Sequence, residues 1–310
     1  MKNDEAVSTV IAMMLILGII ATVIAIYSAT YLPGLKQQSE IEHSREVANA
    51  FVRFGSDIDY VISHKKTARF SEPFSLGGGD VLLSPVRSSG LVTITGQPLV
   101  NVTVIRAGGG EVTGNASLVN ISYVPSFTTW EPQGYRWEYG FVVVTKGNVT
   151  VPQSSDYDTR DEALAKRGDE FLKRFVELDL NLSGASPGIT ITVVNLATSK
   201  GGKSFITGSG IATLEVDATV SETSMVNVTG IIFENRTAGY HDDEVSVMMG
   251  EYLGERCKAV ANAVKEFVGV DNATYIPPGE GESSHKLEFT NPDKYPSVTL
   301  RTVDVEVSVC

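Results

Sequence analysis

Hydrophobic residues open the chain as one continuous run. Residues 6–32, AVSTVIAMMLILGIIATVIAIYSATYL, contain no charged side chain. As an α-helix at about 1.5 Å per residue, this run would extend ~40 Å, which exceeds the ~30 Å hydrocarbon core of a bilayer. The pattern therefore predicts a membrane-spanning helix over residues 6–33, and we expect Pro33 and Gly34 to break or kink it.

The apolar residues that follow have a different period. They recur at spacings of three and four with charged residues between them, which is typical of an amphipathic helix. The apolar members are Leu35, Ile41, Val47, Ala50, Phe51, Phe54, Ile58, Val61 and Ile62. We expect residues 34–68 to form a helical stalk between the membrane helix and the rest of the chain.

Residues 69–310 consist mostly of short alternating runs rich in Val, Thr and Ile, separated by turns such as GGG, AGGG and SKGG. Alternation of this kind predicts β-strands, and periodic segments at 161–175 and 243–268 predict two helices. The expected fold class is α+β, with a long N-terminal helix and a mainly antiparallel, sandwich-like β domain. Whether this domain has one or two parts stays open.

Composition limits the partners of the β domain. The chain has a net charge of −12, and beyond residue 66 it holds 30 acidic against 19 basic side chains. Such a surface argues against nucleic acid and anionic lipid headgroups as partners. The two cysteines, Cys257 and Cys310, are too few for a disulfide framework, although a single bridge between them stays possible.

The start of the chain does not have the pattern of a cleaved secretory signal. Its polar segment, MKNDE, has one lysine against two acids, and no Ala-x-Ala motif ends the apolar run.

Within the run, Gly18, Ala21, Ala25 and Ala29 form a strip of small residues at helical spacing. Such a strip lets helix backbones approach closely.

The segment AVSTVIAMMLILGIIATVIA, which follows the short polar segment MKNDE, resembles the N-terminal segment of archaeal type IV pilins over about 30 residues. Leaders in that family often end in a basic residue or glycine, whereas this one ends in Asp4 and Glu5. The resemblance implies that residues 1–5 are a leader and that a prepilin peptidase cleaves between Glu5 and Ala6. It also implies that the apolar helix passes from the membrane into the core of a filament. The β domain would then face outward.

Asn-x-Ser/Thr triplets are the clearest chemical signal of the β domain. Eight occur where composition predicts roughly two. They begin at Asn101, Asn115, Asn120, Asn148, Asn181, Asn227, Asn235 and Asn272. Two interpretations stay open, N-glycosylation of an extracellular surface, and strand chemistry that turns Asn and Thr toward solvent.

Candidate catalytic and binding motifs point mostly to structural roles. SKGGKS at 199–204 lacks the first glycine of a phosphate-binding loop, so we interpret it as a turn. The acidic residues after His241 and at 154–162 are interpreted as helix starts, and the four histidines show no metal spacing. Trp130, Tyr135, Trp137 and Tyr139 are expected to fill the β core, with a sugar or partner surface as the alternative.

The sequence thus favours a structural protein, with no enzyme activity, metal or cofactor expected. The leading hypothesis is a subunit of an archaeal type IV pilus-like filament that associates with membrane lipid before assembly and with other subunits afterwards. The alternative is a single-pass anchored surface protein whose β domain binds a sugar or a cell-envelope partner. Both hypotheses place the β domain outside the cell.

Overall fold

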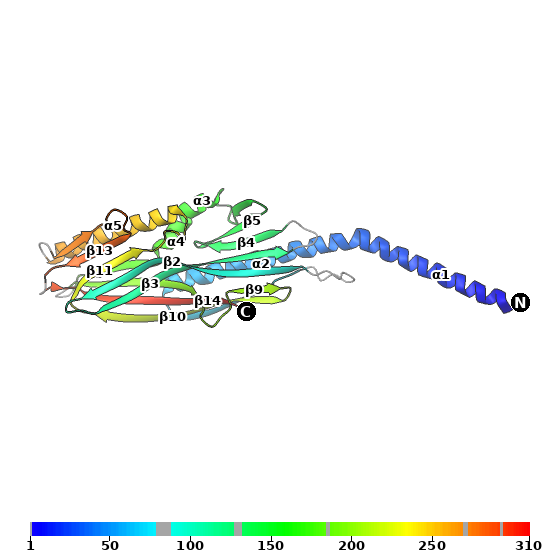
Figure 1. The fold of residues 1–310 in the computed structure, drawn as a ribbon, viewed down its shortest axis with the longest axis horizontal. Coiled ribbons are helices and arrows are strands. Elements are labelled where there is room, and N and C mark those ends of the chain that lie inside the picture. Colours follow the sequence, from blue (N-terminus) through cyan, green and yellow to red (C-terminus); the bar gives the residue numbers. More distant parts are fainter. Residues whose placement is uncertain (1, 79–87, 127–131, 184–186, 269–271, 292–293) are drawn as a thin grey trace.

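The computed structural model describes residues 2–78, 88–126, 132–183, 187–268, 272–291 and 294–310, with side chains from Thr9 onward. Figure 1 shows an elongated body of strands from one end of which a single long helix projects, ending at the N-terminus. This arrangement confirms the α+β class, with a long apolar N-terminal helix ahead of a β-rich domain.

The helices include three long ones and one short interrupted one. Their bounds are α1 (Lys2–Ile26), the π-helical turn η1 (Tyr27–Tyr31), α2 (Leu32–His64), α3 (Arg160–Ala163), the π-helical turn η2 (Leu164–Gly168), α4 (Asp169–Lys173) and α5 (Asp243–Val268). The two helices predicted at 161–175 and 243–268 are confirmed, the first as the α3–η2–α4 segment and the second as α5. Thr159 caps the first of them, because its hydroxyl accepts a hydrogen bond from the Glu162 N–H.

The described strands all belong to one hydrogen-bonded sheet. They are β1 (Ala68–Ser75), β2 (Ser89–Arg106), β3 (Glu111–Ser126), β4 (Gln133–Glu138), β5 (Phe141–Lys146), β6 (Val149–Pro152), β7 (Val176–Asn181), β8 (Gly188–Thr198), β9 (Phe205–Gly208), β10 (Ile211–Met225), β11 (Val228–Asn235), β12 (Ala273–Ile276), β13 (Ser284–Phe289) and β14 (Ser297–Val309). The main order is β1-β10-β14-β8-β3-β2-β11-β13-β12. Most pairs are antiparallel, as predicted, while β8 runs parallel to β14 and β3. The sandwich-like arrangement is not confirmed, since the described strands form one open sheet.

Strand β2 joins two segments that the sequence pattern separates. Residues 91–96 and 99–107 each alternate, and Pro98 lies between them. In the structure a single strand runs through both, and its register against β3 shifts between Pro98 and Val100. A proline is tolerated within a sheet at such a bulge, so β2 continues to pair with β3 on both sides of Pro98.

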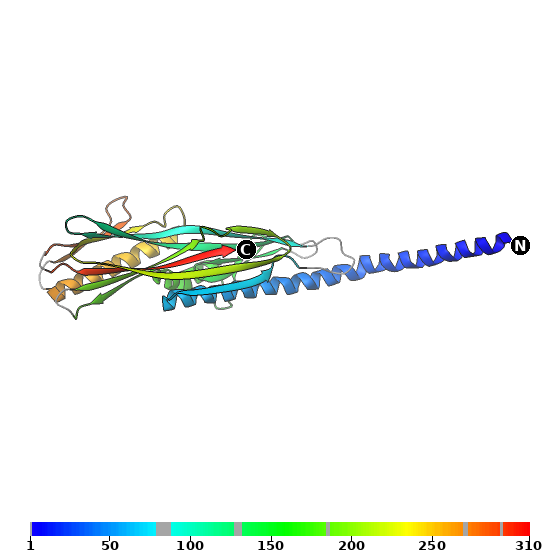
Figure 2. The same ribbon diagram turned by 90° about the horizontal axis from the view of Figure 1, so that it is seen from below.

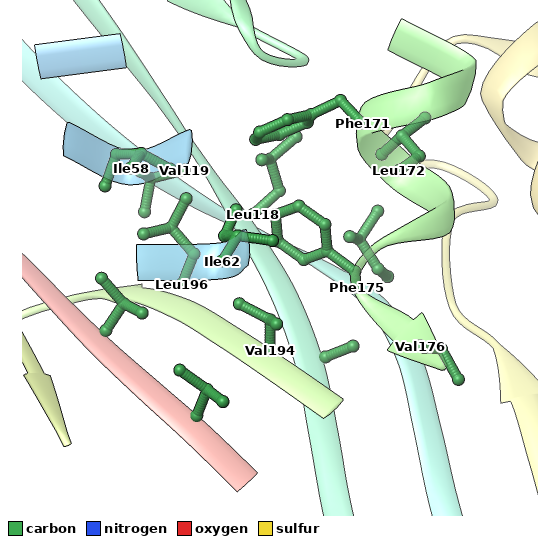
Figure 3. Close-up of a cluster of buried hydrophobic side chains, with 14 of the residues drawn as sticks. Ile58, Ile62, Leu118, Val119, Phe171, Leu172, Phe175, Val176, Val194 and Leu196 are labelled. Carbon is green, nitrogen blue, oxygen red and sulfur yellow. The ribbon is translucent and has the colours of Figure 1, made fainter. Parts of the chain in front are cut away.

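Helix α2 is part of the domain core rather than a separate stalk. The side chains from Val47 to Ile62 on its apolar face are fully or almost fully buried. Figure 3 shows Ile58 and Ile62 meeting Leu118, Val119 and Leu196 of strands β3 and β8. The amphipathic pattern is therefore confirmed, and its apolar face is covered by the sheet.

One hydrophobic cluster connects α2, the sheet and α5. Helix α5 packs on β11, β12, β13 and β7, at the end of the body away from the projecting helix. In Figure 2, α2 enters along one side of the sheet, nearer the N-terminus. The buried residues of the described part of the chain thus form a single cluster.

The expected break at Pro33 and Gly34 takes the form of a π-helical turn. The Leu32 N–H donates to the Tyr27 carbonyl, five residues back, and Pro33 then stands in the first turn of α2. Pro33 has no N–H and its ring clashes with the carbonyl four residues earlier in a regular helix. The wider π-helical turn accommodates both effects, and helix runs through from Thr9 to His64.

Candidate assembly helix

Helix α1 presents an apolar surface that the rest of the chain does not cover. Each large apolar side chain that the structure describes between Val10 and Ile26 is more than half exposed, with Met13 at 70% and Leu17 at 71%. Burial of one such side chain is worth ~1.5–3 kcal/mol. The helix is long and apolar enough to cross a membrane. An apolar surface of this extent requires lipid or protein around it.

Two threonine hydroxyls, one in α1 and one in the π-helical turn η1, bond to carbonyls of the helix itself. The Thr22 hydroxyl donates to the Gly18 carbonyl at 2.8 Å, and the Thr30 hydroxyl donates to the Ile26 carbonyl at 2.7 Å. Backbone groups bond along the helix, which is the condition for residence in lipid. The same condition permits close packing against another helix.

The predicted small-residue strip lies on this exposed surface. At ~100° per residue, Gly18, Ala21 and Ala25 project within about 60° of one another, and Ala29 follows in the π-helical turn. Each of the four is exposed, and a Cβ placed on Gly18 would meet no atom within 4 Å. The strip is therefore accessible to a partner helix.

Polar contacts fix the point where the helix leaves the domain. His43 Nε2 lies 2.9 Å from the Tyr123 hydroxyl, which donates to the Leu76 carbonyl at 2.9 Å. At the next residue of the helix, the Ser44 hydroxyl lies 2.8 Å from the Tyr135 hydroxyl. Burial lowers the pKa of His43, against the opposing charge of Glu46, and this favours the neutral imidazole at this junction.

Ion pairs hold the far end of α2 to neighbouring elements. Asp59 accepts from Arg167 Nη2 and from Arg174 Nη2, each at 2.8 Å. Lys65, just past the helix, pairs with Glu177 of β7. Together with the buried apolar face, these contacts fix α2 against the domain, so the direction of α1 follows from α2.

Sequence reasoning identifies the apolar face of α2 but misses its polar anchors. His43 stands four residues before Val47, and Ser44 stands three before it. Both residues therefore lie on the face that the apolar pattern defines. Their position on that face is the signal from which a buried role could have been inferred.

The predicted processing site lies at the free end of the projecting helix. Glu5 and Ala6 fall in the first turns of α1, more than 20 residues along the chain from the described contacts with the domain. The helix thus keeps this peptide bond far from the β domain.

The eight Asn-x-Ser/Thr sites differ in exposure. Asn115, Asn148, Asn181 and Asn227 are exposed, whereas Asn101 and Asn120 are half-buried. Asn148 lies at the turn between β5 and β6, and Asn227 lies just before β11 with a left-handed backbone, φ 57°. These four exposed sites leave room for a glycan.

Two of the sites are buried in the folded chain. Asn272 has no exposed surface, and its Nδ2 donates to the Lys294 carbonyl at 3.1 Å. Asn235 is 8% exposed, and its Nδ2 donates to the Ser246 carbonyl at 3.0 Å. Both amides connect neighbouring segments, so the folded structure offers neither Nδ2 for glycan attachment.

The other candidate motifs occupy structural positions. SKGGKS forms bends that lead into strand β9, without the helix that a phosphate loop requires. Asp243 and Glu244 begin α5, and Asp161 and Glu162 begin α3. Among the described residues, no group of His, Cys, Asp and Glu side chains is arranged to hold a metal ion.

The aromatic stretch fills the core, as expected. Tyr135, Trp137 and Tyr139 are each less than 5% exposed, and Trp130 lies outside the described residues. The Trp137 ring packs edge-on against Phe54 of α2, with centroids 5.3 Å apart.

Cys257 is buried and Cys310 is exposed, and both are free thiols, so the possible bridge is not formed.

Comparisons with models of known protein families, with curated proteins and with solved structures found no match to this chain. The functional assignment therefore depends on the chain's own sequence and geometry.

Proposed function

We propose that this protein is a structural subunit of an archaeal type IV pilus-like surface filament. Its helix α1 is held in the membrane before assembly and packs against other subunits in the filament core afterwards. The β domain, with glycans on its exposed asparagines, forms the outer surface. Residues 1–5 are removed by a prepilin peptidase, and Ala6 begins the mature chain.

The observation that carries this proposal is an exposed apolar helix joined to an embedded one. Helix α1 projects from the domain with its large apolar side chains uncovered. Because α2 is fixed in the core, a copy of α1 can move between lipid and protein while the domain keeps its fold. In both environments the backbone hydrogen bonds of the helix stay internal.

The small-residue strip supports assembly over simple anchoring. A helix that only crosses lipid has no need of close approach to another helix, whereas a filament core packs helices against one another. Gly18, Ala21 and Ala25 share one face, and the opposite face carries larger side chains such as Ile20. This difference between the two faces fits a helix that packs against another helix through its small-residue face.

A pair of substitutions separates assembly from anchoring. Ala25→Leu places a larger side chain in the small-residue strip. Ile20→Leu is the control, because it keeps the side-chain volume and lies ~200° around the helix from Gly18, on the opposite face. In the native host, we expect Ala25→Leu to reduce the amount of this chain in sheared surface filaments severalfold, with the membrane pool intact, and Ile20→Leu to leave both unchanged. Equal distributions for both variants and the unaltered chain would instead support the anchored, single-pass surface protein.

A further inference from the structure

A cavity of about 360 Å³ lies beside helix α2, between that helix and strands β4 to β6. Its lining includes Val52, Gly55 and Ser56 of α2, and Gln153 and Asp156 from the segment after β6. Its volume is within the range of small-ligand sites in proteins. Ser56, Gln153 and Asp156 are exposed, so the cavity is open to solvent.

The inner surface of the cavity is apolar and aromatic. It includes Trp137, Phe141, Val142 and Pro152, all of them buried, and Tyr157 stands half-buried at the side. Such a surface suits the C–H face of a ring, and aromatic side chains supply large contact areas at low entropic cost.

A buried hydrogen-bond donor without a partner lies at the inner end. The Trp137 indole Nε1 has no hydrogen-bond partner in the described structure. An indole N–H can only donate, and leaving such a buried donor unsatisfied costs ~1–3 kcal/mol. Gly55 lies beside it, and a Cβ there would be 2.9 Å from Nε1. Since Gly55 has no side chain, no Cβ fills the space beside the N–H.

The charges around the cavity favour a neutral ligand. Arg167 is on its wall, but its Nη2 pairs with Asp59 at 2.8 Å and its Nε donates to the Gly140 carbonyl at 2.9 Å. The Asp156 carboxylate accepts from the Ser154 hydroxyl at 2.8 Å and has further acceptor positions. With the cation occupied and a carboxylate at the mouth, phosphate and carboxylate ligands are disfavoured, while hydroxyl donors are favoured.

We propose that this cavity binds one ring of a neutral sugar. A pyranose carries an apolar face for the aromatic inner wall, which includes Trp137, and hydroxyl donors for Asp156 and Gln153. The inference rests on the cavity's own residues and holds for a filament subunit and for an anchored protein alike.

The indole N–H resonances of the full-length protein test this proposal directly. The chain has two tryptophans, so a ¹⁵N-labelled sample in micelles of a detergent without a sugar headgroup gives two indole signals, assigned with Trp130→Phe. Glucose, galactose, mannose and N-acetylglucosamine are titrated separately, with glucose 6-phosphate as the anionic comparison. We expect a saturable shift of the Trp137 signal with at least one neutral sugar and a weaker response to the phosphate.

Two variants locate the binding. Gln153→Ala with Asp156→Ala removes exposed polar groups, and we expect ~tenfold weaker binding from the two lost hydrogen bonds. Glu255→Ala, an exposed acid on α5, is the matched control and should bind as the unaltered chain does. The proposal is overturned if none of the neutral sugars shifts the Trp137 signal saturably, if the phosphate binds more tightly than they do, or if the double variant binds unchanged.

Discussion

The embedded position of α2 makes a sharp prediction at Phe54. This side chain has no exposed surface and packs edge-on against Trp137, which is itself fully buried. Phe54→Ala removes the ring from a site that is enclosed by the helix, the sheet and the aromatic stretch. The matched control is Phe205→Ala on β9, where the same ring is 60% exposed.

The size of the effect follows from burial. Truncation of a fully buried Phe to Ala costs ~3–5 kcal/mol, which includes the transfer of the ring and the cavity left behind. For a domain of about 250 residues, each kcal/mol lowers the melting temperature by ~2–4 °C. We therefore expect Phe54→Ala to lower it by about 10 °C. The exposed control should change stability by no more than ~1 kcal/mol, since surface substitutions usually do little.

The assay is urea and thermal unfolding of the full-length protein in detergent, followed by near-ultraviolet circular dichroism. The buried aromatic cluster gives this signal, so it reports the packing of α2 against the sheet. If Phe54→Ala and Phe205→Ala unfold at the same urea concentration, α2 is a free stalk and the account of the core is wrong.

Three further predictions concern buried polar groups and the glycosylation sites. Burial, and to a smaller extent the Glu72 carboxylate, raises the pKa of Asp57 from 3.8 to about 6, so ionisation of Asp57 destabilises the fold as the pH rises between these values. Asp57→Asn should therefore raise the melting temperature above pH ~6 and leave it unchanged below pH ~4. Arg160 Nε lies 2.5 Å from the carboxylate of Glu138, which is 1% exposed and keeps Arg136 Nε at 3.3 Å. Arg160→Met should therefore cost ~1–3 kcal/mol in urea unfolding, with an unchanged midpoint as the contrary result. Peptide mass spectrometry of the protein from native cells should find glycan on Asn148 and none on Asn272, and the reverse pattern would contradict the folded exposures.

The sequence pattern predicted the helices and strands better than it predicted which of them pack together. The spacing of Phe54, Ile58 and Ile62 defined one helical face, because helical periodicity is a local property. It did not show that β3 and β8 cover that face, since the covering strands lie more than 50 residues away. An amphipathic stalk and an embedded helix share the same pattern, so the domain boundary could not be predicted.

Other differences have the same origin in long-range pairing. Strand β1 contains Pro73, which weakens its strand pattern, and it stands at the edge of the sheet, where proline is tolerated. The parallel pairing of β14 with β8 joins segments about 110 residues apart. The burial of Asn272 depends on the Lys294 carbonyl across a loop. None of these contacts leaves a local signal in the chain.

The N-terminal region shows where local reasoning succeeds in part. The uncharged run predicted α1, and the proline predicted a disturbance after it. The form of that disturbance, a π-helical turn at Tyr27–Tyr31, depends on how the helix absorbs one missing hydrogen bond. The sequence offered a sugar surface only as the alternative for the aromatic stretch around Trp137. The cavity itself could not be predicted, because it is formed where α2 meets a hairpin almost 90 residues later.

The intact mass of this chain in the sheared surface fraction of native cells tests the central claim most directly. We predict that filaments in this fraction contain a chain that begins at Ala6, with residues 1–5 absent and glycan mass added. A chain that starts at Met1 or Lys2 and stays in the membrane fraction, with no copy in the sheared material, would contradict assembly into a filament.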